Sequence, residues 1–135
     1  TEARSSSNVI KIIQTLAENG EIIIENKSYP IEFGNLYFIN CSKKYSVIPA
    51  QKDDYLQNTV MVSREFLDKL AELLDFTKET EDIFKNGYFL PVKHHKIIDD
   101  HFKKMSSVYN SEKAFSKALF TAKFLELLNY AVSSL

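Results

Sequence analysis

The sequence predicts an α+β protein, in which a small barrel or sandwich of short strands is followed by α-helices. Residues 9–62 form short apolar segments separated by turn residues, which is typical of an antiparallel meander that closes on itself. From residue 63 to residue 135 the apolar residues recur at three- and four-residue spacings, which indicates amphipathic helices. A chain of 135 residues has room for a single hydrophobic core, so we expect the barrel and the helices to form one compact unit.

Six strands are predicted from runs of β-branched and aromatic residues that end at turn residues. They span residues 9–16, 21–25, 28–33, 36–39, 45–48 and 59–62. In the third run the side chains alternate, which places Tyr29, Ile31 and Phe33 on one face. Tight turns are expected at residues 18–20, 26–27, 34–35 and 52–54. Residues 1–8 are polar and rich in serine, and we expect a flexible N-terminal lead-in there.

The helical part is expected to begin at Ser63, which has the side chain and the position of an N-cap. Residues 76–87 predict an irregular or weakly helical stretch, which Leu90-Pro91 ends. Residues 94–109 predict a helix with Ile97, Ile98, Phe102, Met105 and Val108 on one side. The last helix is expected to start near Glu112, with Ser111 as its cap.

The last helix is apolar over about 160° of its circumference, against the roughly 100° that packing on one core requires. One side carries Phe120, Phe124, Leu127 and Ala131, and the neighbouring side carries a heptad-like seam. Two interpretations remain open: both sides are buried within one domain, or the seam packs on a second copy of the chain. In the second case the dimer interface comprises Ala118, Thr121, Leu125, Leu128 and Val132.

The charge of the chain is nearly balanced, with 17 basic and 18 acidic residues and a net charge of −1. Binding to the phosphates of DNA normally requires a surplus of Lys and Arg, so this chain is not expected to bind DNA directly. Cys41 is the single cysteine, which excludes an intrachain disulfide and favours a cytoplasmic protein. The longest apolar run is four residues, far short of a membrane span.

The candidate chemical groups are few. His95 and Asp99 have the spacing of a shared metal site, but with His94 and His101 they do not converge on one point, so a solvated helix face is favoured. No histidine precedes His94, so Cys41 has no nearby base to activate it. Tyrosines offer an apolar face and a hydroxyl, so Tyr37, Tyr45 and Tyr55 are either pocket-lining residues or ordinary barrel core. The ligand-pocket candidates are Tyr37, Cys41, Tyr45 and Tyr55.

The run GEIIIENKSYPIEFGNLYFIN, residues 20–40, resembles the N-terminal cupin-type domain of AraC-family transcription regulators. Gly34 and Asn35 match the Gly-Asp turn of that family, with Asn in place of Asp. The segment VMVSREFLDKLAELL resembles the family's exit from barrel to helix, and KALFTAKFLELLNYAVSSL resembles its dimerising helix. The resemblance covers roughly residues 9–135. It implies a cupin-like (jelly-roll) β-barrel over residues 9–62 and a helical dimerisation hairpin within residues 63–135.

The metal-binding pattern of cupins, G-x5-P-x-G-x2-H, is not present. Counted from Gly34, its proline, glycine and histidine positions are occupied by Asn40, Ser42 and Tyr45. The resemblance therefore implies no metal, no cofactor and no catalytic residues. The two C-terminal helix-turn-helix units of the family are also missing, so the chain would be the regulatory half alone.

The resemblance implies the effector-sensing and dimerisation domain of an AraC-type transcription regulator. Such a domain is a homodimer that binds a small molecule, by family analogy a sugar, and reaches DNA only through a further C-terminal domain. Two other interpretations stay open. One is a stand-alone cupin enzyme, such as a sugar isomerase or dioxygenase, which the missing ligands disfavour. The other is a barrel that binds no ligand and serves only to pair subunits.

Overall fold

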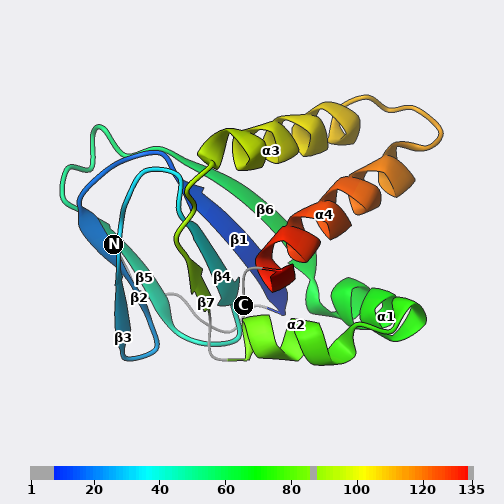
Figure 1. Cartoon of the computed structure of the whole chain (residues 1–135), viewed down its shortest axis with the longest axis horizontal. Coiled ribbons are helices and arrows are strands. Elements are labelled where there is room, and N and C mark those ends of the chain that lie inside the picture. Colours follow the sequence, from blue (N-terminus) through cyan, green and yellow to red (C-terminus); the bar gives the residue numbers. More distant parts are fainter. Residues whose placement is uncertain (1–7, 86–87, 134–135) are drawn as a thin grey trace. The chain divides into compact units, whose positions relative to one another are not determined.

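The computed structural model describes residues 8–85 and 88–133, which form seven strands and four helices (Figure 1). The α+β class predicted from the sequence is confirmed. The elements are β1 (Val9–Thr15), β2 (Gly20–Ile24), β3 (Lys27–Pro30), β4 (Leu36–Asn40), β5 (Tyr45–Pro49), β6 (Gln57–Ser63), α1 (Arg64–Leu74), α2 (Thr77–Phe84), β7 (Tyr88–Leu90), α3 (His95–Tyr109) and α4 (Ser116–Ser133).

The chain divides into two compact units, Thr1–Pro91 and Val92–Leu135. The change from strand to helix lies at Ser63, as predicted, but α1 and α2 belong to the same unit as the strands. Of the predicted lead-in, residues 1–7 lie outside the described residues. Asn8 is described, and its carbonyl accepts a hydrogen bond of 3.0 Å from the backbone N–H of Arg64.

The strands of the first unit form two antiparallel sheets. One sheet has the order β6-β1-β4-β7, and the other has the order β3-β2-β5. In the first sheet Ile13 of β1 pairs with Tyr37 of β4, and in the second Ile24 of β2 pairs with Tyr45 of β5. Residues that pair across two strands lie on the same face of a sheet, and side chains alternate between the faces along each strand. The two pairs therefore determine which residues of β1, β4, β2 and β5 share a face.

The two sheets share one hydrophobic cluster. Its buried members come from alternate positions of strands in both sheets and from the segments that join them, which shows that one face of each sheet packs against the other. They are Ile13, Ile22, Ile24, Ile31, Tyr37, Ile39, Cys41 and Tyr45, with Val9, Tyr29, Val47, Tyr55 and Phe89 half-buried against them. We call this group the inter-sheet cluster.

The opposite face of the first sheet is also buried. Ile12 of β1 pairs with Phe38 of β4, and both side chains are fully buried. Phe84 of α2 packs on this face, with its ring edge-to-face on Phe38 at a centroid separation of 5.8 Å. Strand β1 is therefore apolar at successive positions rather than at alternate ones, as expected for a strand covered on both faces.

Local sequence signals explain two of the junctions. Gly20 begins β2 with a φ of +114°, and a Cβ atom at this position would lie 2.5 Å from the carbonyl oxygen of Ile48, so only glycine fits. Ser63 caps α1, because its hydroxyl oxygen accepts a 3.0 Å hydrogen bond from the backbone N–H of Phe66. The predicted N-cap is thus confirmed.

Several predicted boundaries of the strand region differ from the structure. The turn between β2 and β3 is Glu25-Asn26, because Ile24 pairs with Lys27; the prediction of Asn26-Lys27 was wrong by one residue. Strand β3 ends at Pro30, and Phe33 is 43% exposed instead of sharing a buried face with Ile31.

The segment expected to be irregular or weakly helical contains the helix α2, which confirms the helical alternative. Apolar residues near the end of α2 are buried on the first sheet. Strand β7, by contrast, was not predicted. It pairs with β4, with Phe89 opposite Tyr37. A three-residue strand has no measurable periodicity, and it forms because β4 offers the backbone groups of an uncovered edge.

The second unit is a helical hairpin of α3 and α4, which pack along each other. The predicted start of α4 near Glu112 was wrong, because Glu112 has a left-handed φ of +55° and α4 begins at Ser116. Ser111 donates its hydroxyl to the carbonyl of Val108 over 2.8 Å, so it closes α3 instead of capping α4. Within the described residues, no helix is both long and apolar enough to cross a membrane.

Candidate functional site

The four ligand-pocket candidates meet in the inter-sheet cluster. Tyr37 lies on β4, Cys41 directly follows β4, Tyr45 begins β5, and Tyr55 precedes β6. The first three are buried and Tyr55 is half-buried against them. Segments that are distant in sequence therefore bring three phenols and one thiol to the space between the two sheets.

Tyr37 and Tyr55 hold polar groups at one end of the cluster. The Tyr37 hydroxyl donates to the carbonyl of Pro30, and its ring lies 5.3 Å from that of Phe89. Burial raises the pKa of Tyr37 above its usual 10.0. The Tyr55 hydroxyl donates to Oε1 of Gln57 over 2.5 Å, and burial, with a smaller contribution from Tyr37, raises the pKa of Tyr55 as well. Both phenols thus stay protonated and act as hydrogen-bond donors.

Cys41 and Tyr45 form the other end of the cluster, together with Lys11 of β1. The Lys11 ammonium donates a 2.7 Å hydrogen bond to the Tyr45 hydroxyl, which links the two sheets. Burial raises the pKa of the Cys41 thiol, while Lys11 and Tyr45 act weakly in the opposite direction. Because only a thiolate is a strong nucleophile, this environment does not activate Cys41 for covalent chemistry.

Lys11 is a site residue that the sequence analysis missed. It shares the parity of Val9 and Ile13 within the run Val-Ile-Lys-Ile-Ile, so it must face the same side of the sheet as these two residues. A single charge at an inward position of an apolar strand was the available signal. The signal is weak because β1 is apolar on both faces, which hides the alternation of inward and outward positions.

The edge of the inter-sheet cluster along β6 is exposed to solvent. Gln57, Thr59 and Met61 pair with Thr15, Ile13 and Lys11 of β1, so they share the inward face of the first sheet. All three β6 side chains are nevertheless exposed, with Met61 at 60%. The second sheet therefore leaves this margin uncovered, and solvent reaches the rim of the cluster here.

The three histidines of the second unit do not form a common site. His95 Nδ1 lies 3.3 Å from Oδ2 of Asp99, one turn along α3. His101 Nδ1 lies 3.7 Å from Oε2 of Glu126 on α4, beyond hydrogen-bond distance. In the part of the chain that the structure describes, no group of three or more His, Cys, Asp or Glu is placed to hold a metal ion.

The candidate dimer residues on α4 differ in exposure. Leu128 is buried at 5% exposure and belongs to the same buried face as Phe124 and Leu127. Thr121, Leu125 and Val132 are half-buried, and Ala118 is exposed. The chain itself thus covers Leu128, whereas the remaining seam residues are half-buried or exposed.

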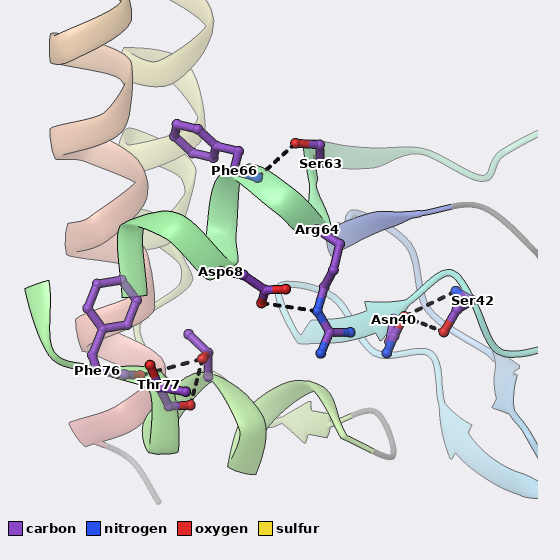
Figure 2. Close-up of polar contacts among 9 residues, drawn as sticks. Asn40, Ser42, Ser63, Arg64, Phe66, Asp68, Phe76 and Thr77 are labelled. Atoms are coloured by element: carbon purple, nitrogen blue, oxygen red, sulfur yellow. Dashed lines mark hydrogen bonds and ion pairs between the residues drawn. The ribbon is translucent and has the colours of Figure 1, made fainter. Parts of the chain in front are cut away.

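A pocket that was not predicted from the sequence lies between α1 and α2. Its volume is about 360 Å³, within the range of small-molecule sites. The apolar lining comes from Leu67 and Phe84, and the polar lining is mostly charged. Figure 2 shows Arg64 and Asp68 of α1, joined by a 3.2 Å ion pair, with Thr77 at the start of α2. The lining residues are Arg64, Leu67, Asp68, Glu72, Thr77, Thr80, Glu81 and Phe84.

Neither the models of known protein families nor the curated proteins give a match to this chain.

Proposed function

We propose that this chain is the effector-sensing and dimerisation domain of an AraC-type transcription regulator, with a small molecule bound in the inter-sheet cluster. Supporting this are the resemblance over residues 20–40 and the two antiparallel sheets, which we propose to be a cupin-like jelly roll. The observation that carries the proposal is the convergence of Tyr37, Cys41, Tyr45 and Tyr55 on one cluster whose edge along β6 is exposed to solvent.

The chemistry of the cluster suits a small molecule with both apolar and polar parts. Seven of the thirteen residues of the cluster are isoleucine or valine. Phenol, ammonium and amide groups accompany them at Tyr45, Lys11 and Gln57. Known ligand sites are built in the same way, from apolar walls and a few fixed polar groups. The proposal assigns no catalytic step and no cofactor to these residues.

The second part of the proposal is pairing through α4. Ala118, Leu125 and Val132 keep exposed or half-exposed surface, and Leu119 beside them is 47% exposed. A two-fold contact that used the same helix from each copy would cover this surface. An effector would then alter how the two copies, and DNA-binding domains joined to them, are arranged. Such a shift is limited by the difference in the effector's affinity for the two arrangements. We place this function in the cytoplasm.

A thermal-shift screen tests the sensing function. The protein is screened against sugars, polyols, small carboxylates and small apolar compounds, and hits are repeated on Tyr45→Phe and Tyr55→Ala variants. We expect at least one compound to raise the melting temperature of the parent and to lose this effect in both variants. The matched control is Tyr109→Ala, because Tyr109 is 73% exposed and lies on α3.

Two outcomes would contradict the sensing function. No stabilising compound, combined with a dimer in solution, would favour a domain that only pairs subunits. Stabilisation that survives in both Tyr45→Phe and Tyr55→Ala would place the ligand outside the inter-sheet cluster.

A further inference from the structure

Lys11 lies where a positive charge is unusual, on the inward face of the first sheet. It is half-buried, and its neighbours on the same face are Val9 and Ile13 of β1 and Met61 of β6. The methylene groups of Lys11 can pack on these apolar side chains, so their burial is ordinary for a lysine. The position of its ammonium group is the unusual feature.

Among the described residues, the ammonium group has an uncharged hydrogen-bond partner. Its hydrogen bond goes to the neutral hydroxyl of Tyr45, which is 6% exposed, and the Cys41 thiol nearby is also neutral. No ion pair within residues 8–85 and 88–133 includes Lys11. An ammonium group has three donors, so it can bond a further partner together with Tyr45.

A partly buried cation without an anionic neighbour is unfavourable, because it has lost part of its hydration without gaining an opposite charge. The Tyr45 hydroxyl also fixes the direction of the ammonium group, as an orienting residue does in a binding site. The uncovered margin along β6 provides a route, since Met61, the direct cross-strand partner of Lys11, is 60% exposed. An incoming anion would therefore meet a positioned donor at the rim of an apolar cluster.

We infer that the effector is an anionic small molecule, a monocarboxylate with an apolar body, whose carboxylate pairs with Lys11. The apolar body lies against the half-buried rim of the inter-sheet cluster, where Val9 and Val47 present aliphatic surface. This inference rests on the proposed sensing function and replaces the sugar suggested by family analogy with a different ligand class. Lys11 and Tyr45 together form the carboxylate-recognition pair.

The test compares matched probes that differ only in charge. Hexanoate is compared with 1-hexanol, and phenylacetate with 2-phenylethanol, by thermal shift and isothermal titration on the full chain. We expect the carboxylates to stabilise the parent more than the alcohols. Their affinity should fall roughly ten- to hundredfold in Lys11→Met, the range expected for loss of a charge-assisted hydrogen bond. Lys11→Arg should keep most of the affinity.

Controls separate charge from packing and folding. Lys27→Met removes an exposed lysine of β3 and should leave carboxylate affinity unchanged. Tyr45→Phe removes only the hydroxyl that orients Lys11, and should weaken the carboxylates without affecting the alcohols. If Lys11→Met does not fold, the comparison of probes on the parent and on Tyr45→Phe decides the outcome.

The inference is overturned if the alcohols bind as tightly as the carboxylates, or if Lys11→Met keeps full carboxylate affinity. Neutral compounds that bind the parent but not Tyr55→Ala would overturn the anionic ligand class and leave the sensing function standing. If no probe and no compound of the wider screen binds at the inter-sheet cluster, both the anionic ligand class and the sensing function are contradicted.

Discussion

Phe38 of β4 and Phe84 of α2 meet edge-to-face, with ring centroids 5.8 Å apart and an interplanar angle of 72°. Both rings are at most 2% exposed, so this contact fastens the helix to the sheet face opposite the inter-sheet cluster. We predict that Phe84→Ala lowers the free energy of unfolding by about 3–5 kcal/mol, because it removes the ring and leaves a cavity. Urea denaturation followed by circular dichroism measures this.

The matched control for Phe84 is Leu73→Ala on α1, where Leu73 is 79% exposed. Its effect should stay within about 0.5 kcal/mol, as for most surface changes. Equal effects of the two substitutions would show that α2 does not contribute to the core.

Tyr37→Phe removes one partly buried hydrogen bond and leaves the ring in place. The Tyr37 hydroxyl donates to the Pro30 carbonyl, which loses this donor in the variant. We predict a loss of about 1–3 kcal/mol in the free energy of unfolding. The control is Tyr109→Phe, at 73% exposure, which should have almost no effect. A Tyr37→Phe variant as stable as the parent would mean that the Pro30 carbonyl finds another donor.

The stability of the protein should fall at alkaline pH. Burial raises the pKa of Cys41 above its ordinary 9.0, so the unfolded chain loses the thiol proton first as the pH rises. The folded state then binds more protons than the unfolded state, and stability decreases upward from about pH 9. Tyr37 and Tyr55, whose pKa values are also raised from 10.0, add to the decrease above about pH 10.

Cys41→Ala isolates the contribution of the thiol. Urea midpoints of parent and variant, measured from about pH 8 to about pH 10, should show a smaller decrease for the variant. Identical pH profiles would mean that the thiol titrates alike in the folded and unfolded states.

If two copies pair through α4, a charged residue on the half-buried side of this helix should abolish the dimer. Leu125→Glu should convert a dimer into a folded monomer, because an unpaired buried charge costs several kcal/mol. The matched control is Lys123→Glu, which changes charge two positions away. Sedimentation velocity measures the state, and circular dichroism confirms folding. A parent that remains monomeric at high concentration would rule out pairing.

Leu128 was predicted to lie in that interface, but a substitution there does not test pairing. Its side chain is already buried at 5% exposure, so a charge there would disrupt the chain itself. The helical angles predicted a broad apolar arc correctly, but they could not assign each side of it to a partner. That assignment depends on which neighbouring elements cover α4, and periodicity within one helix does not contain this information.

Much of the strand region could be predicted from the sequence. β1 and β4 follow from runs of β-branched and aromatic residues, and the cap at Ser63 follows from local chemistry. Strand β7 could not be predicted, because three residues become a strand only when β4 provides a pairing edge. Tertiary pairing of this kind overrides local preference.

The candidate site was predicted in part. Tyr37, Cys41, Tyr45 and Tyr55 were named from their chemistry, and the structure brings them to one cluster. Their meeting depends on the pairing of β1 with β4 and of β2 with β5, which no single segment specifies. The inward position of Lys11 could have been predicted from the sequence, because Lys11 lies two residues from both Val9 and Ile13, which face inward.

The most direct test of the sensing function is an amide NMR titration of the isotope-labelled chain. The ligand is the compound that raises the melting temperature most in the screen. We predict that the largest shift changes fall on β1, β4 and β5, around Lys11, Tyr37 and Tyr45. Changes confined to the α1–α2 pocket, around Leu67 and Phe84, would contradict the account.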